Sequence, residues 1–142
     1  MGKPRHPDAA KFLKDRLFDD LDSFRTLEKR ISALPEKLDR GMAFEVFAEA
    51  WFATHSLSQA DRDRGCVWPK PAVPSKLTKK LKLPKRDMGD DGVLETVLGA
   101  HHVYQVKFRS DRTLSRWKDL STFFGISDRA DERVIFTNCT KL

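Results

Sequence analysis

The stretch from Asp91 to Phe108, DGVLETVLGAHHVYQVKF, decides the fold. It predicts a strand at about residues 92–98, a turn at Gly99-Ala100-His101 and a second strand at about residues 102–108. Side chains alternate along a strand, so Tyr104, Val106 and Phe108 share a core-facing side, while Gln105 and Lys107 share the other. Pairing through the turn brings Asp91 beside Gln105 and Lys107 at one sheet edge. His101 and His102 are expected to face solvent.

Two segments before this hairpin have the apolar spacing of helices. Residues 8–33 predict one helix, whose inner face carries Leu13, Leu17, Leu21, Phe24 and Ile31. After a break at Pro35, Glu36 to about His55 predicts a second helix, with Phe44, Phe47, Ala48 and Trp51 on one face. Glu45 and Glu49 lie one turn apart on an adjoining face of that helix.

The segment after the hairpin predicts a helix and a last strand. Ser115 is a suitable N-cap, Trp117, Leu120 and Phe124 form an inward face, and Gly125 is placed to end the helix. Residues 133–137 then predict a strand. The order α-β-β-α-β follows, and a short strand near Trp68 would extend it to α-β-β-β-α-β. We therefore predict an α/β domain with a mixed sheet.

Composition narrows the class of protein. The chain has 142 residues, enough for one domain with its own core, and 34% of them are charged. No apolar run has the length of a bilayer span, and no apolar stretch follows the basic N-terminus, so we expect a cytoplasmic protein without a membrane partner. Cys66 and Cys139 are too few for a disulfide framework and lack zinc-site spacing, so both are expected as free thiols.

Positive charge is concentrated in one segment. The net charge is +6, and residues 62–86 alone carry nine basic residues against the single acid Asp63. Pro69, Pro71, Pro74 and Pro84 also fall here, so we interpret residues 56–86 as a basic insertion, either ordered or mobile. Its position just before the acidic turn favours a phosphate-binding role; the alternative is a solvated loop that aids solubility.

Four segments together resemble the PD-(D/E)xK superfamily of restriction-endonuclease-like nucleases, in the Mrr-like branch where glutamine replaces the middle acid. They are Gly41-Met42-Ala43-Phe44-Glu45, Asp87 to Val93, Gln105-Val106-Lys107 and Val134 to Asn138. The resemblance implies an αβββαβ core at residues 36–142 behind an N-terminal helical extension at residues 1–35. It also implies a DNA-cleaving module of a larger restriction, defence or mobile-element helicase protein. We expect the chain to be truncated at its C-terminal end.

The resemblance also implies a site for Mg²⁺ or Mn²⁺. Asp91, the amide oxygen of Gln105 and the backbone carbonyl of Val106 would bind the cation, since hard divalent ions prefer oxygen. Glu45 would assist directly or through water. Lys107 would orient or deprotonate the attacking water, or neutralise developing charge. Gln105 removes one negative charge from the commoner motif, which should weaken cation binding without DNA.

Each assignment has an alternative. Asp87 and Asp90 compete with Asp91, and either is also a common turn residue. Glu45 can equally be a surface glutamate, and Gln105 and Lys107 can simply form a half-exposed strand face. The basic residues expected to bind DNA are Lys79, Lys80, Lys82, Lys85, Arg86, Arg109, Arg112 and Arg116.

Three functional hypotheses follow. The first is a metal-dependent DNA endonuclease, which would need a second copy to cut both strands. The second is a catalytically inactive nuclease-like module that binds DNA. The third is a protein-interaction domain that uses its N-terminal helix as the contact surface.

Overall fold

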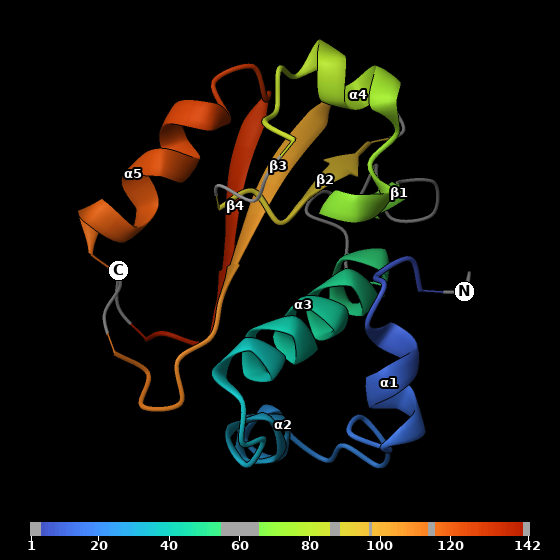
Figure 1. The fold of residues 1–142 in the computed structure, drawn as a ribbon, viewed down its shortest axis with the longest axis vertical. Coiled ribbons are helices and arrows are strands. Elements are labelled where there is room, and N and C mark those ends of the chain that lie inside the picture. The colour runs from blue at the N-terminus through green and yellow to red at the C-terminus, as the bar shows by residue number, and fades with distance from the viewer. Residues whose placement is uncertain (1–3, 55–65, 86–88, 97, 114–115, 141–142) are drawn as a thin grey trace.

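A four-stranded mixed sheet forms the centre of the molecule (Figure 1). The computed structural model describes residues 4–54, 66–85, 89–96, 98–113 and 116–140. Its strands are β1 (Cys66–Pro69), β2 (Gly92–Glu95), β3 (His101–Lys107) and β4 (Glu132–Thr137), adjacent in that order. The first three run antiparallel, and β4 runs parallel to β3. The predicted α/β class with a mixed sheet is confirmed, and the residues around Trp68 form an edge strand.

Helices precede the strands and lie between them along the chain. They are α1 (Ala9–Lys14), α2 (Phe24–Ser32), α3 (Lys37–Thr54), the short 3-10 helix η2 (Lys70–Ala72), α4 (Ser75–Lys80) and α5 (Trp117–Ile126). The helix predicted from Glu36 to about His55 is confirmed as α3 over its described residues. Apart from η2 and α4, which lie between β1 and β2, the order from α3 onward is α-β-β-β-α-β.

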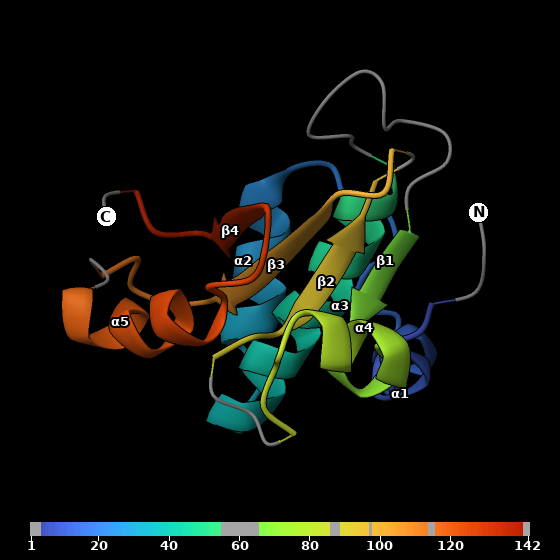
Figure 2. The ribbon, with the colours of Figure 1, turned by 90° about the horizontal axis from the view of Figure 1, so that it is seen from above.

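Each face of the sheet has its own core. Ala48 and Phe52 of α3 pack on one face, against Leu94, Tyr104 and Phe136. Phe123 of α5 packs on the other, in a cluster with Val93 and Val103. A third cluster joins α1 and α2 to α3 through Phe12, Leu27, Ile31 and Phe44, and it reaches the sheet at Val106 and Phe136. The helices therefore lie on both sides of the sheet, with α1, α2 and α3 together on one of them (Figures 1 and 2).

The single helix predicted over residues 8–33 is wrong. The structure has two helices there, α1 and α2, separated by a turn in which Arg16 and Asp20 adopt positive φ angles of 59° and 51°. A left-handed residue cannot continue a right-handed helix. Leu17 and Ile31 are buried as predicted, whereas Leu13 is 50% exposed and Phe24 is 42% exposed.

Three smaller expectations also fail. His101 and His102 are buried, because they belong to the inner strand β3 instead of the turn before it. Gly125 lies inside α5 instead of ending it, and Trp117 is 67% exposed while Phe123 takes the inward position.

Both cysteines are free thiols, as predicted.

Some predictions fall outside the described residues. They concern Ser115 as an N-cap, Asp87 as a rival acid, Arg86 as a DNA contact, and the first part of the basic insertion at residues 56–65. Within the part of the chain that is described, no helix has both the length and the apolar character needed to cross a bilayer.

The ring of Tyr104 packs closely against Gly92 in the sheet. The two residues are opposite each other in the β2–β3 pairing, and the phenol ring of Tyr104 lies directly over Gly92. A Cβ atom at residue 92 would stand only 2.2 Å from Cζ and Oη of Tyr104. The ring is held from its other side by Phe52, with a centroid separation of 4.9 Å. Any larger residue at position 92 must therefore displace a buried ring.

We predict that Gly92→Ala destabilises the protein by about 2 kcal/mol, the usual cost of overpacking a core. Gly41→Ala is the matched control, because a Cβ atom there meets nothing within 4 Å and the residue lies inside α3. It should stabilise the protein by about 0.5–1 kcal/mol. Urea unfolding measures both; equal midpoints for the two variants would contradict the contact.

Candidate active site

Asp91 is fixed at the point where β2 begins. Its backbone N–H donates to the carbonyl of Tyr104 at 2.9 Å, and its own carbonyl accepts from the N–H of Lys70 at 2.9 Å. Its carboxylate Oδ2 accepts from the backbone N–H of Val106 at 2.6 Å. The carboxylate thus accepts the hydrogen bond that a backbone carbonyl would accept if β2 were longer. The carboxylate is held at the start of β2, beside the backbone of β3.

Asp91 and Glu45 line the same cavity, of about 500 Å³. The walls come from separate parts of the chain: the N-terminal residues 6–8, Met42 and Glu45 of α3, the segment from Lys70 to Lys85, and the acidic turn before β2. Glu45 is half-buried on α3. The predicted convergence of an acid on this helix with the acid before the strand therefore occurs, through the packing of α3 across the sheet.

The other acid of this turn has a different role. Asp90 is 2% exposed, and both of its oxygens lie 2.7 Å from Nζ of Lys70. A buried carboxylate needs such a partner, since burying an unpaired charge is costly. Asp90 is thus committed to an ion pair in the wall of the cavity, which favours Asp91 over Asp90 as the functional acid. Nothing in the sequence singled out Lys70 from the other basic residues.

Nearby carboxylates affect the protonation of the buried Tyr104. Burial raises the pKa of the Tyr104 hydroxyl well above its ordinary value, and the negative charges of Asp91, Glu49 and Glu45 raise it further. Both effects favour the protonated form of the Tyr104 hydroxyl. These three carboxylates come from two places in the fold, the residue before β2 and helix α3.

Gln105 is buried on the opposite side of the sheet from α3. Its neighbours in β3, Tyr104 and Val106, pack toward α3, so alternation turns Gln105 toward α5. It is 2% exposed, and its amide lies under Gly89, where a Cβ atom would stand 2.9 Å from Nε2. Among the described residues, Oε1 of Gln105 has no hydrogen-bond partner. A buried amide oxygen without a donor is an available ligand atom.

Lys107 lines a second cavity, of about 430 Å³, at the end of β3. Lys37 and Arg40 from the first turn of α3 and Arg109 from the following loop share this cavity, with Asp111 as its acidic member. Arg40 also donates to the carbonyl of Leu34 at 2.8 Å, so it is held in place. The cavities of Asp91 and Lys107 lie along successive parts of α3.

The donor atoms fit a hard cation. Among the described residues there is no cluster of three or more His, Cys, Asp or Glu side chains suited to a metal. The expected ligands are all oxygen atoms: the carboxylates of Asp91 and Glu45, the amide oxygen of Gln105 and the carbonyl of Val106. The N–H and C=O of one strand residue leave the same edge, so the Val106 carbonyl is directed to the side of Asp91. Oε1 of Gln105 is a further oxygen without a hydrogen-bond partner among the described residues, but it lies on the sheet face away from α3 and does not line the cavity of Asp91 and Glu45.

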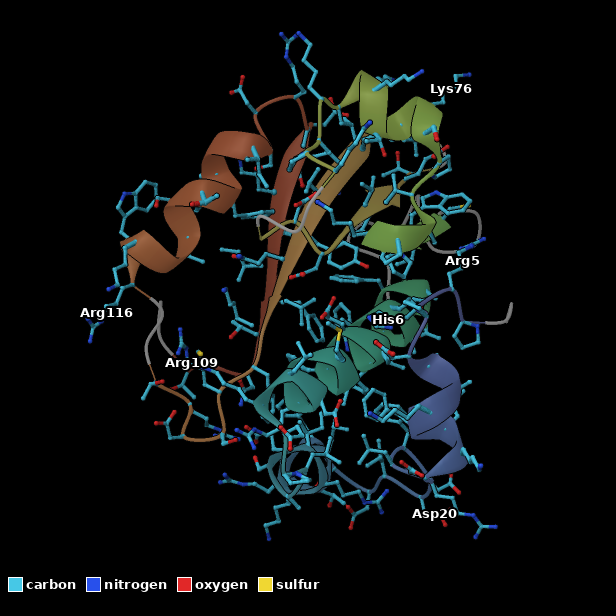
Figure 3. All side chains as sticks on the ribbon, viewed as in Figure 1. Arg5, His6, Asp20, Lys76, Arg109 and Arg116 are labelled. Atoms are coloured by element: carbon cyan, nitrogen blue, oxygen red, sulfur yellow. The ribbon has the colours of Figure 1, made fainter. Side chains whose placement is uncertain are left out.

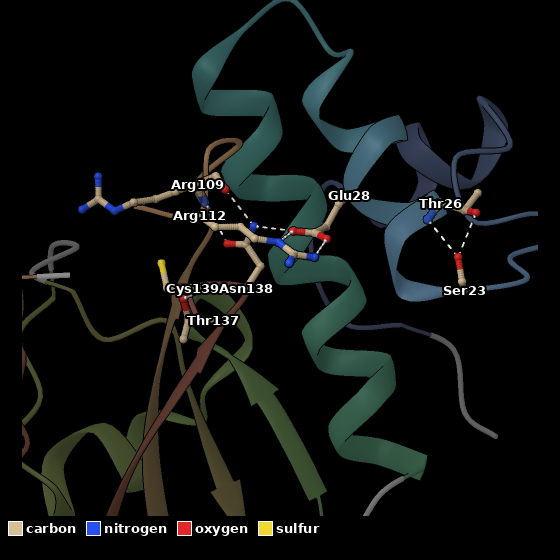
Figure 4. A network of polar contacts seen from close by, with 8 residues as sticks. All are labelled: Ser23, Thr26, Glu28, Arg109, Arg112, Thr137, Asn138 and Cys139. Atoms are coloured by element: carbon tan, nitrogen blue, oxygen red, sulfur yellow. Dashed lines mark hydrogen bonds and ion pairs between the residues drawn. The ribbon is translucent and has the colours of Figure 1, made fainter. Parts of the chain in front are cut away.

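A buried polar network holds the loop that follows Lys107 (Figure 4). Glu28 of α2 accepts from both arms of the Arg112 guanidinium, with Nε at 2.8 Å, and from Nδ2 of Asn138 at 2.9 Å. Asn138 also bonds both the N–H and the carbonyl of Arg109, at 2.9 and 2.7 Å. The network ties α2, the loop after β3 and the end of β4 together. It fixes the backbone on which Arg109 stands.

The residues predicted to contact DNA have different surroundings. Lys79 and Lys80 of α4 and the following Lys82 and Lys85 are exposed. Arg116 is exposed ahead of α5, and Arg109 is half-buried. The guanidinium of Arg112 is taken by Glu28, so its charge is neutralised within the protein. Arg112, although expected to contact DNA, therefore serves to hold the fold together through Glu28.

Comparisons with known proteins give no relative from which to transfer a role. No family model matches the chain, and neither a curated protein nor a solved structure matches it.

We predict that Glu28→Gln removes part of the acid sensitivity of folding. The hydrogen bond from Arg112 is the largest cause of a lowered pKa at Glu28, and the bond from Asn138 adds to it against the effect of burial. A lowered native pKa stabilises the fold above the pKa of the unfolded chain, about 4.3, and this gain is lost as the pH falls through the native pKa. At pH 7 the variant should lose about 2 kcal/mol.

Urea unfolding at pH 7 and at decreasing pH below about 4.5 measures this effect. The difference between wild type and Glu28→Gln should narrow as the pH falls. Glu36→Gln, at an exposed glutamate, serves as the control and should keep the wild-type profile. A difference between wild type and Glu28→Gln that stays constant with pH would contradict the pairing.

Proposed function

We propose that the protein is a Mg²⁺-dependent DNA endonuclease of the restriction-endonuclease-like, PD-(D/E)xK type. The observation that carries the proposal is the convergence of Asp91 and Glu45, from different elements, on one cavity beside β3. The order of elements from α3 to β4 agrees with the αβββαβ core of that superfamily. Mn²⁺ would replace Mg²⁺, since both take oxygen ligands.

The residues would divide the work as follows. Asp91, Gln105 and the Val106 carbonyl would hold the cation, with Glu45 beside Asp91 in the cavity. When bound, the cation would activate water and neutralise charge on the phosphate. The Val106 N–H keeps the Asp91 carboxylate in one position, so the ligand geometry is set before substrate arrives. Lys107 would act from its neighbouring cavity on the phosphate or the attacking water.

DNA would be attracted by two basic surfaces. One is the exposed lysines of α4 and of the turn after it, which stand on the far side of the Asp91 cavity from α3. The other is the cavity of Lys107, whose Lys37, Arg40 and Arg109 outnumber its single acid, Asp111. Phosphates bind such clusters largely by releasing counterions. The acidic cavity between them would receive the bond to be cut.

A second candidate is a DNA-binding module that does not cut. It is favoured by the position of Gln105, which is neutral, faces away from α3 and replaces the commoner acid, and by Lys107 lining a cavity other than that of Asp91. We propose in either case that the chain works in the cytoplasm as one module of a longer restriction, defence or mobile-element protein. Remaining domains or a second copy would then supply what one site lacks.

We predict that the wild-type protein nicks plasmid DNA in Mg²⁺ or Mn²⁺ and that Asp91→Asn and Lys107→Ala each lower the rate at least about 100-fold. Asparagine keeps an oxygen to accept from the Val106 N–H but loses the charge, so the fold should survive. Conversion of supercoiled to nicked plasmid over time is the measurement.

Lys14→Ala, at an exposed lysine of α1, is the matched control and should cut at the wild-type rate. Equal products from wild type and both site variants would remove the catalytic proposal. DNA binding without any cutting, unchanged by EDTA, would favour the second candidate.

We predict that DNA binding depends on the lysines of α4. Replacing Lys79 and Lys80 together with glutamine should lower the slope of log K against log salt by about 1–2. The control replaces Lys14 and Lys29, exposed lysines of α1 and α2, and should leave the slope unchanged. Fluorescence anisotropy with labelled duplex DNA in EDTA measures both. A slope that is equal in the two double variants would contradict this surface.

A further inference from the structure

The N-terminal strap, residues 4–8, is fastened to the rest of the fold by side chains. Glu49 of α3 is buried, and its two oxygens accept from the backbone N–H groups of Arg5 at 2.7 Å and His6 at 3.0 Å. The Arg5 guanidinium donates to the carbonyl of Val67 at 2.9 Å and lies 4.2 Å from the ring centre of Trp68. The strap therefore connects α3 to the edge strand β1.

This fastening places His6 in the candidate active site. His6 is 6% exposed and lies against α3 (Figure 3), in the wall of the cavity that Asp91 and Glu45 share. Its Nε2 atom is 3.7 Å from Oε1 of Glu45. That distance is longer than a direct hydrogen bond, and a small shift or one water molecule would close it. Polar contacts in unliganded catalytic sites are often loose in this way.

The hydrogen bond at Nδ1 of His6 determines the tautomer of its ring. The backbone N–H of Asp8 donates to Nδ1 at 3.1 Å, so Nδ1 acts as an acceptor and carries no proton. A neutral imidazole then carries its proton on Nε2, the atom that faces Glu45. In this state Nε2 is a donor and is not a metal ligand. Its natural partner is the carboxylate of Glu45.

We propose that His6 is a positioning residue of the site: its Nε2–H holds the Glu45 carboxylate toward the cavity that contains Asp91. The inference rests on the proposed nuclease function and adds the N-terminal strap to the machinery of that site. Without the donor, Glu45 would lose its fixed orientation, and the affinity of the site for a divalent cation would fall. Partners that orient a ligand typically affect metal affinity about 10- to 100-fold.

Two substitutions test the roles of the two His6 nitrogens separately. His6→Asn leaves an amide oxygen near the Nδ1 position to accept from Asp8, but has no donor at Nε2. His6→Gln extends its amide to the Nε2 position and can donate to Glu45. We expect His6→Asn to raise the Mg²⁺ concentration for half-maximal cutting about tenfold. His6→Gln should recover most of that loss.

Binding of Mn²⁺ alone gives a readout independent of cutting. Electron paramagnetic resonance of free Mn²⁺ should show weaker binding for His6→Asn than for wild type, with His6→Gln in between. The effect should require Glu45: in a Glu45→Gln background, His6→Asn should add nothing, as a double-mutant cycle tests. Glu36→Gln is the matched control, as an exposed glutamate just before α3. Urea unfolding of each variant separates a loss of cation affinity from a loss of fold.

Each outcome decides the proposal. A Mg²⁺ dependence of His6→Asn equal to that of wild type, when wild type cuts, overturns the positioning role and leaves the proposed function standing. Independent, additive effects of His6→Asn and Glu45→Gln also overturn it. A wild-type protein that neither cuts DNA nor binds Mn²⁺ overturns both proposals. Should His6→Asn unfold, a His6→Gln protein that matches Glu45→Gln in its weak Mn²⁺ binding overturns the role.

Discussion

The hydrogen bond between the Asp91 carboxylate and the Val106 N–H is the constraint on which the site depends. At 2.6 Å it takes the place of a ladder bond that β2 is too short to make. It extends the pairing of β2 with β3 by one hydrogen bond and fixes an acid at that end of the two strands. Gly92, the first residue of β2, follows Asp91 directly, and the Tyr104 ring leaves no room for a side chain at that position. The acid is thus held by the backbone of two strands.

How far the sequence predicts the structure depends on the range of the interactions. The period of Phe44, Phe47, Ala48 and Trp51 predicts α3, and alternation through Tyr104, Gln105 and Val106 predicts both faces of β3, because these patterns repeat within a single element. The break between α1 and α2 escaped prediction, since apolar spacing continued through residues 15–23 while the backbone turned left-handed at Arg16 and Asp20. Nothing in those two side chains requires that conformation.

At the site, the sequence predicts that Glu45 and Asp91 lie together, but it does not predict the residues that pair with the acids of the cavity. The pairing of Asp90 with Lys70 and the contact of His6 with Glu45 join residues 20 or more positions apart, without a repeating pattern. Sequence distance also hides that Gln105 is covered on its own face by Gly89. Such contacts follow from the packing of α3 and the strap, which no local rule describes.

Charge in the two cavities leads to a last consequence under the proposed function. Four carboxylates, of Asp8, Glu45, Asp90 and Asp91, outnumber the two lysines, Lys70 and Lys85, that line the first cavity, so the cavity disfavours a phosphate until a cation enters. The lysines of α4 and the cavity of Lys107 attract the same polyanion. Cation and DNA then favour each other's binding, and linkage makes the coupling reciprocal. The neutral Gln105 strengthens this dependence, because it leaves the cation with fewer protein charges and more reliance on phosphate oxygens.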